Sequence, residues 1–599
     1  MATVTDSATG ITTTYYYDFT DRLMKYVESS SGSSHSVQYG YDDINNLTSL
    51  VETINGTAHT TSYAYDDDNR LTTVTNGSVS KTYGYDAYSR VSGRTTKYGT
   101  STILTDTLTY MIPMSNQGTT GQVGSLRSQA AGYDVTYTYN YDGNGNILYI
   151  SDGTNITLYA YDSANQLIRE NNQAANKTWV WTYDDGGNIT SRTEYPYSTG
   201  GLGTATATVN YTYDTSWGDL LTGYNGQTIS SDTIGNMLSD GTWTYTWEHG
   251  RELATMSNGT TTWTYTYNAD GMRTSRSNGT TAYSYVYNGS SLSQMTVGSD
   301  TLYFAYDAST PMSVTYNGST YYYVTNLQGD VTAILNTAGA PVVTYTYDAW
   351  GNILSANGTM ADSLGTLNPL RYRSYVYDHE TGLYYLQSRY YDPELGRFIN
   401  ADGFAATGKG IVGNNMFAYC NNNPVLYIDS AGNLPMLNKV LRMSDGGGHD
   451  SQYQAQQTKK MLEELSADEI YYGSAAITIS GSANNNQTTV AVESSLSHGF
   501  IEATDSINSI TDMFGAYAGG SIGFNGASYE YGAYLFKETI QFEIWDDAKM
   551  EVGVIIGVGK EKGLSGEGVT VGGACGLGGF ISIIWDDASK TIYIEEKKN

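Results

Sequence analysis

The side chains that could carry nucleophilic, metal-dependent or hydrolytic chemistry are few in this sequence. Cys420 and Cys575 lie far apart, so they form neither a disulfide framework nor a pair of metal ligands. His449 and His498 lie in the C-terminal part, where a nuclease would need carboxylates and basic side chains beside them. Residues 434–599 hold 22 acidic and 11 basic side chains, a balance that disfavours contact with phosphates. We therefore interpret both histidines as linker or turn residues, and we expect no metal site and no cofactor.

The charge of the whole chain restricts its partners. The formal net charge is −30, from 60 acidic and 30 basic residues. An acidic surface repels a phosphate backbone, so no nucleic acid is expected as a partner. No stretch approaches the ~20 apolar residues of a membrane-spanning helix, so no transmembrane segment is expected. No signal peptide precedes Thr3, and this start predicts either an incomplete product or export without a cleavable signal.

A tyrosine-led phrase repeats along the first part of the chain. Tyr-x-Tyr-Asp is followed by small polar residues, Asn, and then Leu or Ile, as in residues 63–71 and 159–167. The phrase returns roughly every 20 to 24 residues, a period that indicates one supersecondary unit stacked many times. The series includes Tyr17-Asp18, Tyr41-Asp42, Tyr65-Asp66, Tyr85-Asp86, Tyr141-Asp142, Tyr161-Asp162 and Tyr183-Asp184.

Between these pairs the sequence alternates at the period of a β-strand. Residues 136–141, 243–247, 263–267 and 283–287 place aromatic side chains on one face and small polar side chains on the other. Asn-Gly pairs separate many such runs and suit two-residue hairpin turns. With 57 tyrosines and only 8 prolines, the composition also favours strands. We predict an all-β fold over residues 10–433, in which a sheet of hairpins coils back on itself with Tyr and Trp facing the interior.

The repeats stop near Gly432, and the remainder of the chain has a different character. After a Gly-rich linker, residues 451–465 have the apolar spacing of a short helix. Gly-rich apolar runs over residues 470–594 predict a return to strands, either in a small separate sheet or in a membrane-active β domain. The phrase Ile-Trp-Asp-Asp-Ala occurs at residues 544–548 and 584–588, and we expect a similar hairpin turn at each.

One block of the sequence is specific enough to indicate a family. Residues 368–373 (Asn-Pro-Leu-Arg-Tyr-Arg), residues 377–398 and residues 413–424 form one continuous block. This block resembles the RHS repeat-associated core of the RHS/YD-repeat family, and the upstream Tyr-Asp units resemble its repeats. Together they cover about residues 10–433. The resemblance implies a β-strand ribbon that spirals into a hollow shell, a core that closes one end as a plug, and a variable C-terminal domain, often a toxin used against competing bacteria.

The resemblance implies three parts and a function. Residues 1–366 would form the YD-repeat β shell, residues 367–433 the closing core, and residues 434–599 a smaller, Gly-rich C-terminal domain with a short helix followed by strands. The protein would be secreted or at the cell surface of a bacterium, and would encapsulate and deliver its own C-terminal domain as cargo. A cognate immunity protein and a secretion apparatus would be partners. The alternative is a non-catalytic surface protein for adhesion, which binds glycans or proteins through its repeats.

The same resemblance points to a pair of carboxylates. Family members that release their cargo carry two Asp-Pro-x-Gly motifs, whose aspartates act together as an aspartyl protease on the chain after the second motif. Two carboxylates that share one proton supply a base for water and an acid for the leaving amide. The matching residues are Asp402, in Asp-Gly-Phe-Ala, and Asp429, in Asp-Ser-Ala-Gly, so both motifs lack the proline that restricts the preceding residue. Self-cleavage would cut between Asn433 and Leu434; the alternative is that both aspartates are turn residues.

Four arginines stand out in the core block of a chain with few basic residues. They are Arg371, Arg373, Arg389 and Arg397. One interpretation has them position the cleavage segment. We favour the other, in which they pair with acidic residues close by in the sequence of the core. Those acidic residues are Asp378, Glu380, Asp392 and Glu394. Asp392 also precedes a proline, but we interpret it as a turn residue of the core.

Overall fold

The computed structural model describes residues 2–5, 10–30, 33–112, 120–307, 310–403, 414–433 and 436–437, and beyond these only strands of the tail. The chain divides into two compact units, Met1–Lys460 and Met461–Asn599. Nearly all regular structure in the described part of the first unit is β-strand, which confirms the all-β prediction. Among the residues described, no helix is long and apolar enough to cross a membrane. The three-part division at residues 366 and 433 stays a prediction.

The first sheet contains 20 strands, and each strand pairs antiparallel with the next one along the chain. Only short hairpin loops are needed for such a meander. Its strands are β1 Ala2–Thr5, β2 Thr12–Tyr17, β3 Leu23–Ser30, β4 Ser33–Tyr41, β5 Leu47–Ile54, β6 Thr57–Tyr65, β7 Leu71–Asn76, β8 Val79–Tyr85, β9 Val91–Tyr98, β10 Ser101–Tyr110, β11 Val123–Ala130, β12 Tyr133–Tyr141, β13 Ile147–Ser151, β14 Ile156–Tyr161, β15 Leu167–Asn172, β16 Lys177–Tyr183, β17 Ile189–Pro196, β18 Ala207–Tyr213, β19 Leu221–Tyr224 and β20 Gln227–Thr228.

A second sheet of 14 strands continues the same meander. Its strands are β21 Ser230–Ser231, β22 Met237–Ser239, β23 Thr244–Glu248, β24 Glu252–Ser257, β25 Thr262–Tyr267, β26 Arg273–Ser277, β27 Ala282–Asn288, β28 Ser291–Val297, β29 Asp300–Tyr306, β30 Pro311–Tyr316, β31 Ser319–Thr325, β32 Val331–Leu335, β33 Pro341–Tyr347 and β34 Ile353–Asn357. The two sheets together form one ribbon of hairpins in sequence order.

The alternation of aromatic and small polar residues places the aromatics on the buried face. In β25, Trp263 and Tyr265 are buried, whereas the threonines on either side of each are exposed. In β27, Tyr283 and Tyr285 alternate with exposed small residues in the same way. The largest hydrophobic cluster of the described residues contains these four aromatics together with side chains of the core block. The predicted inward orientation of Tyr and Trp is therefore confirmed in these strands.

Each Tyr-Asp unit ends in a turn that its aspartate organises. Asp66 Oδ1 accepts the N–H of Asp68 at 3.1 Å and that of Arg70 at 2.9 Å, and Asp66 Oδ2 accepts Arg70 Nε at 2.8 Å. Asn69 adopts the left-handed conformation at φ 64°, which Asn tolerates well. The pairing register then shifts at Tyr65, as a β-bulge after such a turn requires. The same aspartate contacts recur at Asp18, Asp42, Asp86, Asp142, Asp162, Asp184, Asp232 and Asp348.

The tyrosine of each unit links its turn to the preceding one. Tyr65 Oη donates to the carbonyl of Leu47, the residue that follows the preceding turn, at 3.0 Å. Eleven bonds of this kind join successive units, and we call them the tyrosine ladder. The other donor–acceptor pairs are Tyr41–Leu23, Tyr85–Leu71, Tyr110–Val91, Tyr141–Val123, Tyr161–Ile147, Tyr183–Leu167, Tyr213–Ile189, Tyr267–Leu253, Tyr306–Leu292 and Tyr347–Val331.

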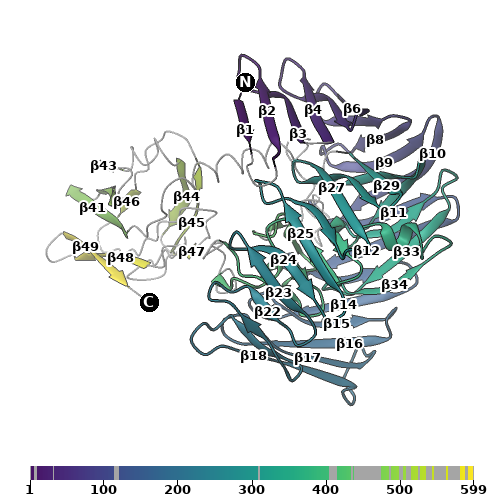
Figure 1. The fold of residues 1–599 in the computed structure, drawn as a ribbon. Helices are drawn as coiled ribbons and strands as arrows, with labels where there is room; N and C mark the ends of the chain where they lie inside the picture. The colour runs from purple at the N-terminus through teal and green to yellow at the C-terminus, as the bar shows by residue number, and fades with distance from the viewer. Residues whose placement is uncertain are drawn as a thin grey trace. The chain divides into compact units, whose positions relative to one another are not determined.

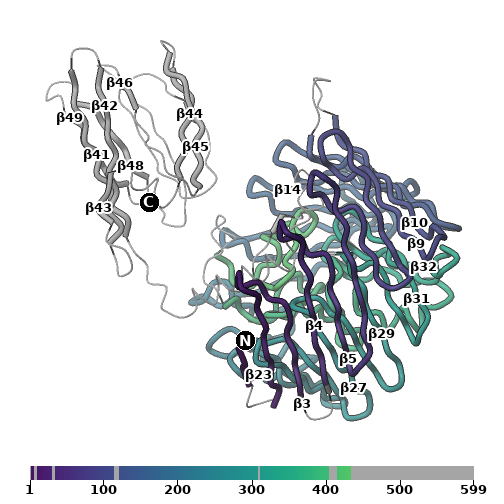
Figure 2. The backbone as a smooth tube through the Cα atoms, turned by 90° about the horizontal axis from the view of Figure 1, so that it is seen from above, coloured from purple at the N-terminus to yellow at the C-terminus, as the bar shows by residue number. Residues whose placement is uncertain are grey.

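The ribbon coils back on itself, so strands far apart in the sequence lie together (Figure 1, Figure 2). The hairpin ends of β5, β8 and β10 pack against β29–β32 in a second hydrophobic cluster. A buried ion pair joins Lys81 Nζ to Asp307 Oδ2 at 2.5 Å across the same contact. Tyr39 Oη also donates to Asn288 Oδ1 at 3.1 Å. These contacts turn the ribbon into the shell that the sequence predicts.

The core block, residues 367–433, packs as a plug on the row of Tyr-Asp turns. Its elements, with the helix that leads into it, are α1 Leu364–Leu367, η1 Tyr372–Ser374, β35 Val376–Asp378, β36 Leu383–Tyr385, β37 Tyr390–Asp392, β38 Arg397–Phe398, η3 Cys420–Asn422 and β39 Tyr427–Ile428, and the short strand β40 Met436–Leu437 pairs with β39. The hydroxyls of Tyr372, Tyr384 and Tyr391 donate to the carbonyls of Ala349, Gly351 and Trp350 in one turn, at 2.8, 2.9 and 2.7 Å.

Strands also recur in the tail. They are β41 Ser474–Asn484, β42 Gln487–Ser497, β43 Ala503–Ser506, β44 Gly515–Gly523, β45 Gly526–Tyr534, β46 Phe542–Ile544, β47 Lys562–Gly563, β48 Phe580–Asp586 and β49 Thr591–Lys597. Strands β48 and β49 pair antiparallel, with Asp586 opposite Thr591, as the hairpin expected at the second copy of the phrase requires. At the first copy the residues after Ile544 lie outside the described residues, so the hairpin expected there stays a prediction. The predicted helix at residues 451–465 lies outside the described residues.

We predict that loss of one rung of the tyrosine ladder weakens the shell. Tyr183 Oη donates to Leu167 O at 2.6 Å, so Tyr183→Phe leaves that carbonyl without its partner. The free energy of unfolding should fall by about 1 to 1.5 kcal/mol, the net value of one such hydrogen bond. Tyr88→Phe is the matched control, because the Tyr88 side chain is 64% exposed. Urea unfolding followed by fluorescence would measure both, and equal losses would contradict the role of the ladder.

A buried carboxyl group predicts that the shell loses stability as the pH rises. Glu170 of β15 is fully buried and accepts the N–H of Ala349 at 3.0 Å, next to Asp348. Burial raises the pKa of Glu170 above its ordinary value of 4.5, and the Asp348 carboxylate raises it further. The folded state therefore holds a proton that the unfolded chain releases, so stability falls as the pH increases above about 4.5, by at most ~1.4 kcal/mol per pH unit.

The substitution Glu170→Gln should flatten this dependence, because it removes the titrating proton. Its single oxygen keeps one of the two hydrogen bonds that the Glu170 oxygens accept from Ala349 N and Asn172 Nδ2, so the loss of the other lowers stability equally at every pH. Urea unfolding of both proteins between pH 5 and pH 8 would compare the slopes. An unchanged slope in Glu170→Gln would show that other groups cause the pH dependence.

Candidate functional site

Asp402 and Asp429 lie on either side of one arginine in the plug. Arg389 Nη2 is 3.0 Å from Asp402 Oδ2 and 3.3 Å from Asp429 Oδ2. The two oxygens are therefore no farther apart than 6.3 Å, these two distances taken together. The two carboxylates therefore lie near each other, with the Arg389 guanidinium between them. The structure thus brings together the two residues that the resemblance singled out, while their action on the chain stays a prediction.

Separate elements of the plug hold the three members of this site. Asp402 follows β38, and its N–H donates to the carbonyl of Met416 at 2.8 Å. Arg389 directly precedes β37, and its Nη1 donates to the same carbonyl at 3.0 Å. Asp429 follows β39, and its N–H donates to the Tyr375 hydroxyl at 2.7 Å. Backbone contacts therefore fix both aspartates independently of the ion pairs.

The predicted cleavage bond follows Asn433, which lies between the paired strands β39 and β40 in the sequence. In these strands Ile428 pairs with Met436. Asp429 Oδ1 accepts the N–H of Asn433 at 2.9 Å, so the carboxylate lies beside the residue that precedes the bond. Leu434, on the other side of the bond, lies outside the described residues.

Ser388 and Arg389, in the connection between β36 and β37, bind the segment 431–433. Arg389 Nε donates to the carbonyl of Gly432, and Ser388 Oγ donates to the carbonyl of Ala431 at 2.7 Å and lies 2.5 Å from Asn433 Oδ1. Gly432 is in the left-handed region at φ 74°, and a Cβ atom there would approach the Leu386 carbonyl to 2.6 Å. Only glycine fits this approach. The glycine retained from the family motif therefore has a direct structural reason.

The site is buried and its charges are concentrated. The exposed fractions of Arg389, Asp402 and Asp429 are 3%, 3% and 1%. Burial lowers the pKa of the Arg389 guanidinium, and the two carboxylates oppose that shift. An arginine remains charged at physiological pH even so, because its ordinary pKa exceeds 12. Arg251, half buried, donates to the carbonyl of Ala401 and adds a second positive charge near Asp402.

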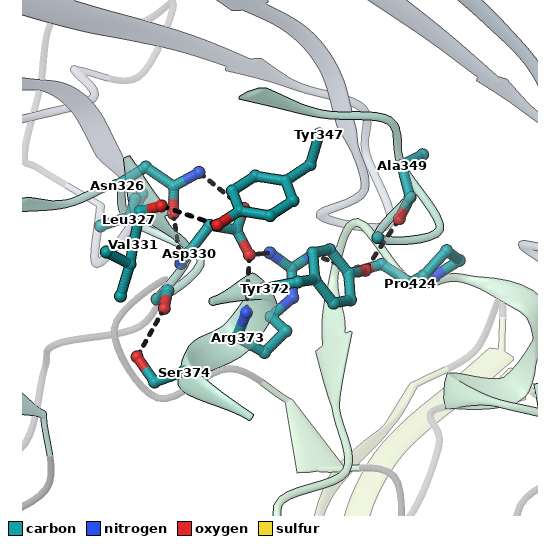
Figure 3. A network of polar contacts seen from close by, with 12 residues as sticks. Asn326, Leu327, Asp330, Val331, Tyr347, Ala349, Tyr372, Arg373, Ser374 and Pro424 are labelled. Atoms are coloured by element: carbon teal, nitrogen blue, oxygen red, sulfur yellow. Dashed lines mark hydrogen bonds and ion pairs between the residues drawn. The ribbon is translucent and has the colours of Figure 1, made fainter. Parts of the chain in front are cut away.

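The expected pairing of the core arginines with nearby acidic residues of the core is wrong. Arg373 Nη1 instead pairs with Asp330 of the shell at 2.7 Å (Figure 3). Arg371 Nη2 donates to the carbonyl of Gly365 at 2.9 Å, and Arg397 Nη2 donates to the carbonyl of Asp219 at 2.6 Å.

The acidic residues of the core likewise face other partners. Asp378 pairs with Arg273 of β26 at 2.6 Å, and Glu380 pairs with Arg276 of the same strand at 2.7 Å. Asp392 accepts the N–H of Glu394 at 2.8 Å, as a turn residue does, which agrees with its interpretation. Closeness in sequence misled the prediction. Arg373, Asp378 and Glu380 form their ion pairs with residues of the shell, and Arg389 pairs with more distant aspartates of the plug itself.

The remaining candidates add no chemistry to the described part of the chain. Cys420 is buried as a free thiol, and burial raises its pKa well above the ordinary value. A thiol of this kind is unreactive because it stays protonated. Within the described residues, no group of three or more His, Cys, Asp or Glu side chains could hold a metal ion. His449, His498 and Cys575 lie outside the described residues.

Sequence reasoning missed two residues of the site, Ser388 and Tyr375. Both belong to the specific block, and Ser388 directly precedes an arginine that the sequence did single out. Their contacts depend on how the plug folds back on residues 431–433, and no spacing in the sequence encodes that. The only indication in the sequence was that both residues belong to the block that resembles the RHS repeat-associated core.

Comparison with known proteins matches the same part of the chain. The Teneurin YD-shell family matches residues 77–234 and 297–425. The tRNA3(Ser)-specific nuclease WapA of Bacillus spizizenii is 32% identical over 280 residues, which cover 45% of this chain and 12% of the relative. The double-stranded DNA deaminase toxin A of Burkholderia cenocepacia is 33% identical over 112 residues, 19% of this chain and 7% of the relative. The matches thus span only a small part of either relative's length.

A solved structure of the Tc holotoxin pore of Photorhabdus luminescens covers 73% of this chain and 27% of its own, with 16% identity and a TM-score of 0.48.

The fold and the site define a class of protein. Its members have a β shell of Tyr-Asp hairpins and a plug that packs on the turns of the shell and contains two neighbouring aspartates. The family match falls on the shell and on most of the plug. Over those residues the chain is similar to the YD-shell family, in agreement with the resemblance of its repeats and core block to the RHS/YD-repeat family.

Proposed function

We propose that this shell encapsulates residues 434–599 and delivers them as cargo in competition between bacteria. The observation that carries the proposal is the docking of the plug on the turns of the shell, from which the chain continues past Asn433 into a tail of different composition. The two relatives share the matched region and are named for different activities, a tRNA nuclease and a DNA deaminase. A common shell that carries different cargos accounts for both facts.

The proposal extends to the localisation and the partners. A cargo that harms a competitor requires export or surface display, and a secretion apparatus to achieve it. The producing cell needs a cognate immunity protein against its own tail. The acidic balance of residues 434–599 does not favour a nucleic-acid target for this particular cargo.

The proposed release step is self-cleavage at Asn433–Leu434. One carboxylate of the pair Asp402 and Asp429 takes a proton from the attacking water, and the other, protonated, gives one to the leaving amine. Arg389 acts as a positioning residue, because it contacts both carboxylates and the carbonyl of Gly432. The contact of Asp429 with Asn433 N supports Asp429 as the carboxylate next to the bond.

The delivery role predicts that the tail is harmful on its own. Inducible expression of residues 434–599 in the bacterial cytoplasm should slow or stop growth, whereas expression of residues 1–433 should not. Growth curves after induction measure both. If neither part affects growth, the adhesion alternative, in which the repeats bind glycans or proteins, becomes the better account.

Self-cleavage predicts a defined product. Mass spectrometry of the purified chain should find a fragment that begins at Leu434. Asp429→Asn and Asp402→Asn should each reduce its amount at least a hundredfold, because a general acid or base contributes about 10²- to 10⁴-fold to rate.

Asp392→Asn is the matched control, since Asp392 is a partly buried aspartate of the plug that lies outside the pair. This variant should give the product in full. If the Asp429→Asn protein folds normally and still yields the fragment, the two aspartates do not catalyse the cleavage and are turn residues only.

A further inference from the structure

The segment that ends at Asp402 is attached to the shell as well as to the plug. Met237 N, at the start of β22, donates to the carbonyl of Ile399 at 3.0 Å, and Ala401 N donates to the carbonyl of Gly235 at 3.2 Å. Two such bonds, in opposite directions and two residues apart on each segment, are the pattern of antiparallel strands. The backbone directly before Asp402 is therefore paired with the backbone of the shell.

A shell arginine completes this attachment. Arg251 lies between β23 and β24, and its Nη1 donates to the carbonyl of Ala401 and, at 3.4 Å, to the carbonyl of Ile234. The N–H and the carbonyl of Ala401 are thus both bound to the shell, and Ala401 is completely buried. Arg251 also interacts electrostatically with the Asp402 carboxylate. One side chain of the shell therefore acts on the position of Asp402 and on its charge.

The shell turn fits the plug closely at Gly235. Gly235 is in the left-handed region at φ 88°, and a Cβ atom there would approach Trp217 of the shell to 2.7 Å and Ala401 and Phe417 of the plug to 2.9 and 3.0 Å. Carbon atoms that are not bonded to each other are most stable about 3.5 to 4.0 Å apart, so even one methyl group would push the plug segment away. The turn is therefore shaped to receive the segment before Asp402.

The two carboxylates rest on different supports. Asp429 is held within the plug, where its N–H donates to the Tyr375 hydroxyl at 2.7 Å and its Oδ2 lies 3.3 Å from Arg389 Nη2. Asp402 also has a contact within the plug, from its N–H to the carbonyl of Met416 at 2.8 Å, and the shell supplies its second support. The placement of Asp402 opposite Asp429 therefore depends on the docking of the plug.

We propose that docking of the plug on the shell switches the carboxylate pair on. Arg251 and Gly235 are positioning residues, which hold Asp402 at the distance from Asp429 that the reaction needs. A chain whose plug is not docked would keep its tail attached, so release follows closure of the shell. This inference rests on the self-cleavage proposed above and adds its regulation.

The substitution Gly235→Ala tests this coupling without changing either carboxylate or Arg389. It should reduce the fragment that begins at Leu434 by roughly 10- to 100-fold, because a misplacement of about 1 Å can cost a reaction on the order of 100-fold. Mass spectrometry of the full chain at fixed times measures the fragment. Gly259→Ala is the matched control, since Gly259 has a similar conformation at φ 82° and a Cβ atom there would meet nothing within 4 Å. The control should cleave like the unchanged protein.

Hydrogen exchange shows whether the segment is docked. The amides of Met237 and Ala401 should exchange slowly in the unchanged protein and rapidly in Gly235→Ala, since their acceptors lie across the contact. Unchanged exchange in β3 to β9 would show that the rest of the shell remains folded.

The substitution Arg251→Met tests the same support by a second change. The fragment should fall by roughly 10-fold, the effect of one hydrogen bond from a charged group. The limb of the pH–rate profile that belongs to Asp402 should move to higher pH, because the loss of a positive charge favours the protonated carboxyl. Arg251→Lys keeps the charge and should restore both the rate and the profile, whereas a role in packing alone would not move the profile. Arg127→Met is the matched control, at an arginine whose side chain is 48% exposed.

Three results would overturn the inference. Full cleavage in Gly235→Ala while Met237 and Ala401 exchange rapidly would show that the pair works without docking, and the self-cleavage proposal would stand. An equal loss in Gly259→Ala would assign the effect to backbone strain in the shell. Absence of the fragment from the unchanged chain would overturn the self-cleavage itself, and its regulation with it.

Discussion

The hydrogen bond from each Tyr-Asp tyrosine to the residue after the preceding turn sets the geometry of the whole ribbon. Backbone pairing fixes only the spacing of neighbouring strands, and leaves a long sheet free to twist and to slip at its turns. The tyrosine ladder adds a bond between successive turns, for example from Tyr161 to Ile147 and from Tyr183 to Leu167. Tyrosine suits this role because its ring packs in the interior while its hydroxyl satisfies a carbonyl. Phenylalanine would bury as well but would leave each carbonyl without its partner, which explains why tyrosine stands at the ladder positions.

The row of turns that the ladder aligns is also the surface on which the plug docks. The residue four positions after the aspartate is often an amide, whose nitrogen binds the aspartate and whose oxygen remains available. Asn146 Nδ2 donates to Asp142, and Asn146 Oδ1 accepts Asn423 Nδ2 of the plug at 2.8 Å. Gln166 and Asn188 accept plug asparagines at 2.8 Å in the same way.

Earlier turns carry arginine at this position, and arginine has no acceptor to offer. They are Arg22, Arg70 and Arg90, and each contacts the aspartate of its own turn. Asn46 and Asn236 are amides at the same position whose oxygens have no hydrogen-bond partner in the described part of the chain. An amide at this position is therefore needed for these contacts with the plug but does not by itself mark the turns that meet it. The asparagines of residues 414–424 supply the donors for these bonds, since Asn415, Asn422 and Asn423 donate to the amide oxygens of the turns.

The alternation of neighbouring residues predicted the fold, but it did not predict which residues the charged side chains contact. The alternation around Trp263 and Tyr283 is a property of neighbouring residues, so the strands, their buried face and the coiled ribbon could all be predicted. The hairpin at residues 584–588 followed from a repeated phrase for the same reason. Arg373 and Asp330 meet only after the shell has closed around the plug, and no local rule connects them. Sequence proximity therefore failed for the core arginines, whereas the family resemblance succeeded in bringing Asp402 and Asp429 to one place.

The two missing prolines act on the backbone and not on the packing of the site. The position after Asp402 is Gly403, where a Cβ atom would meet nothing within 4 Å, and the position after Asp429 is the exposed Ser430. The described structure shows no contact that a side chain at either position must make, so the loss of proline acts on the backbone. Arg389 and the tight approach of Gly432 hold the pair and the segment after Asp429. In the second motif the retained glycine is therefore the position that the geometry cannot replace, whereas Ala405, which stands at the glycine position of the first motif, lies outside the described residues.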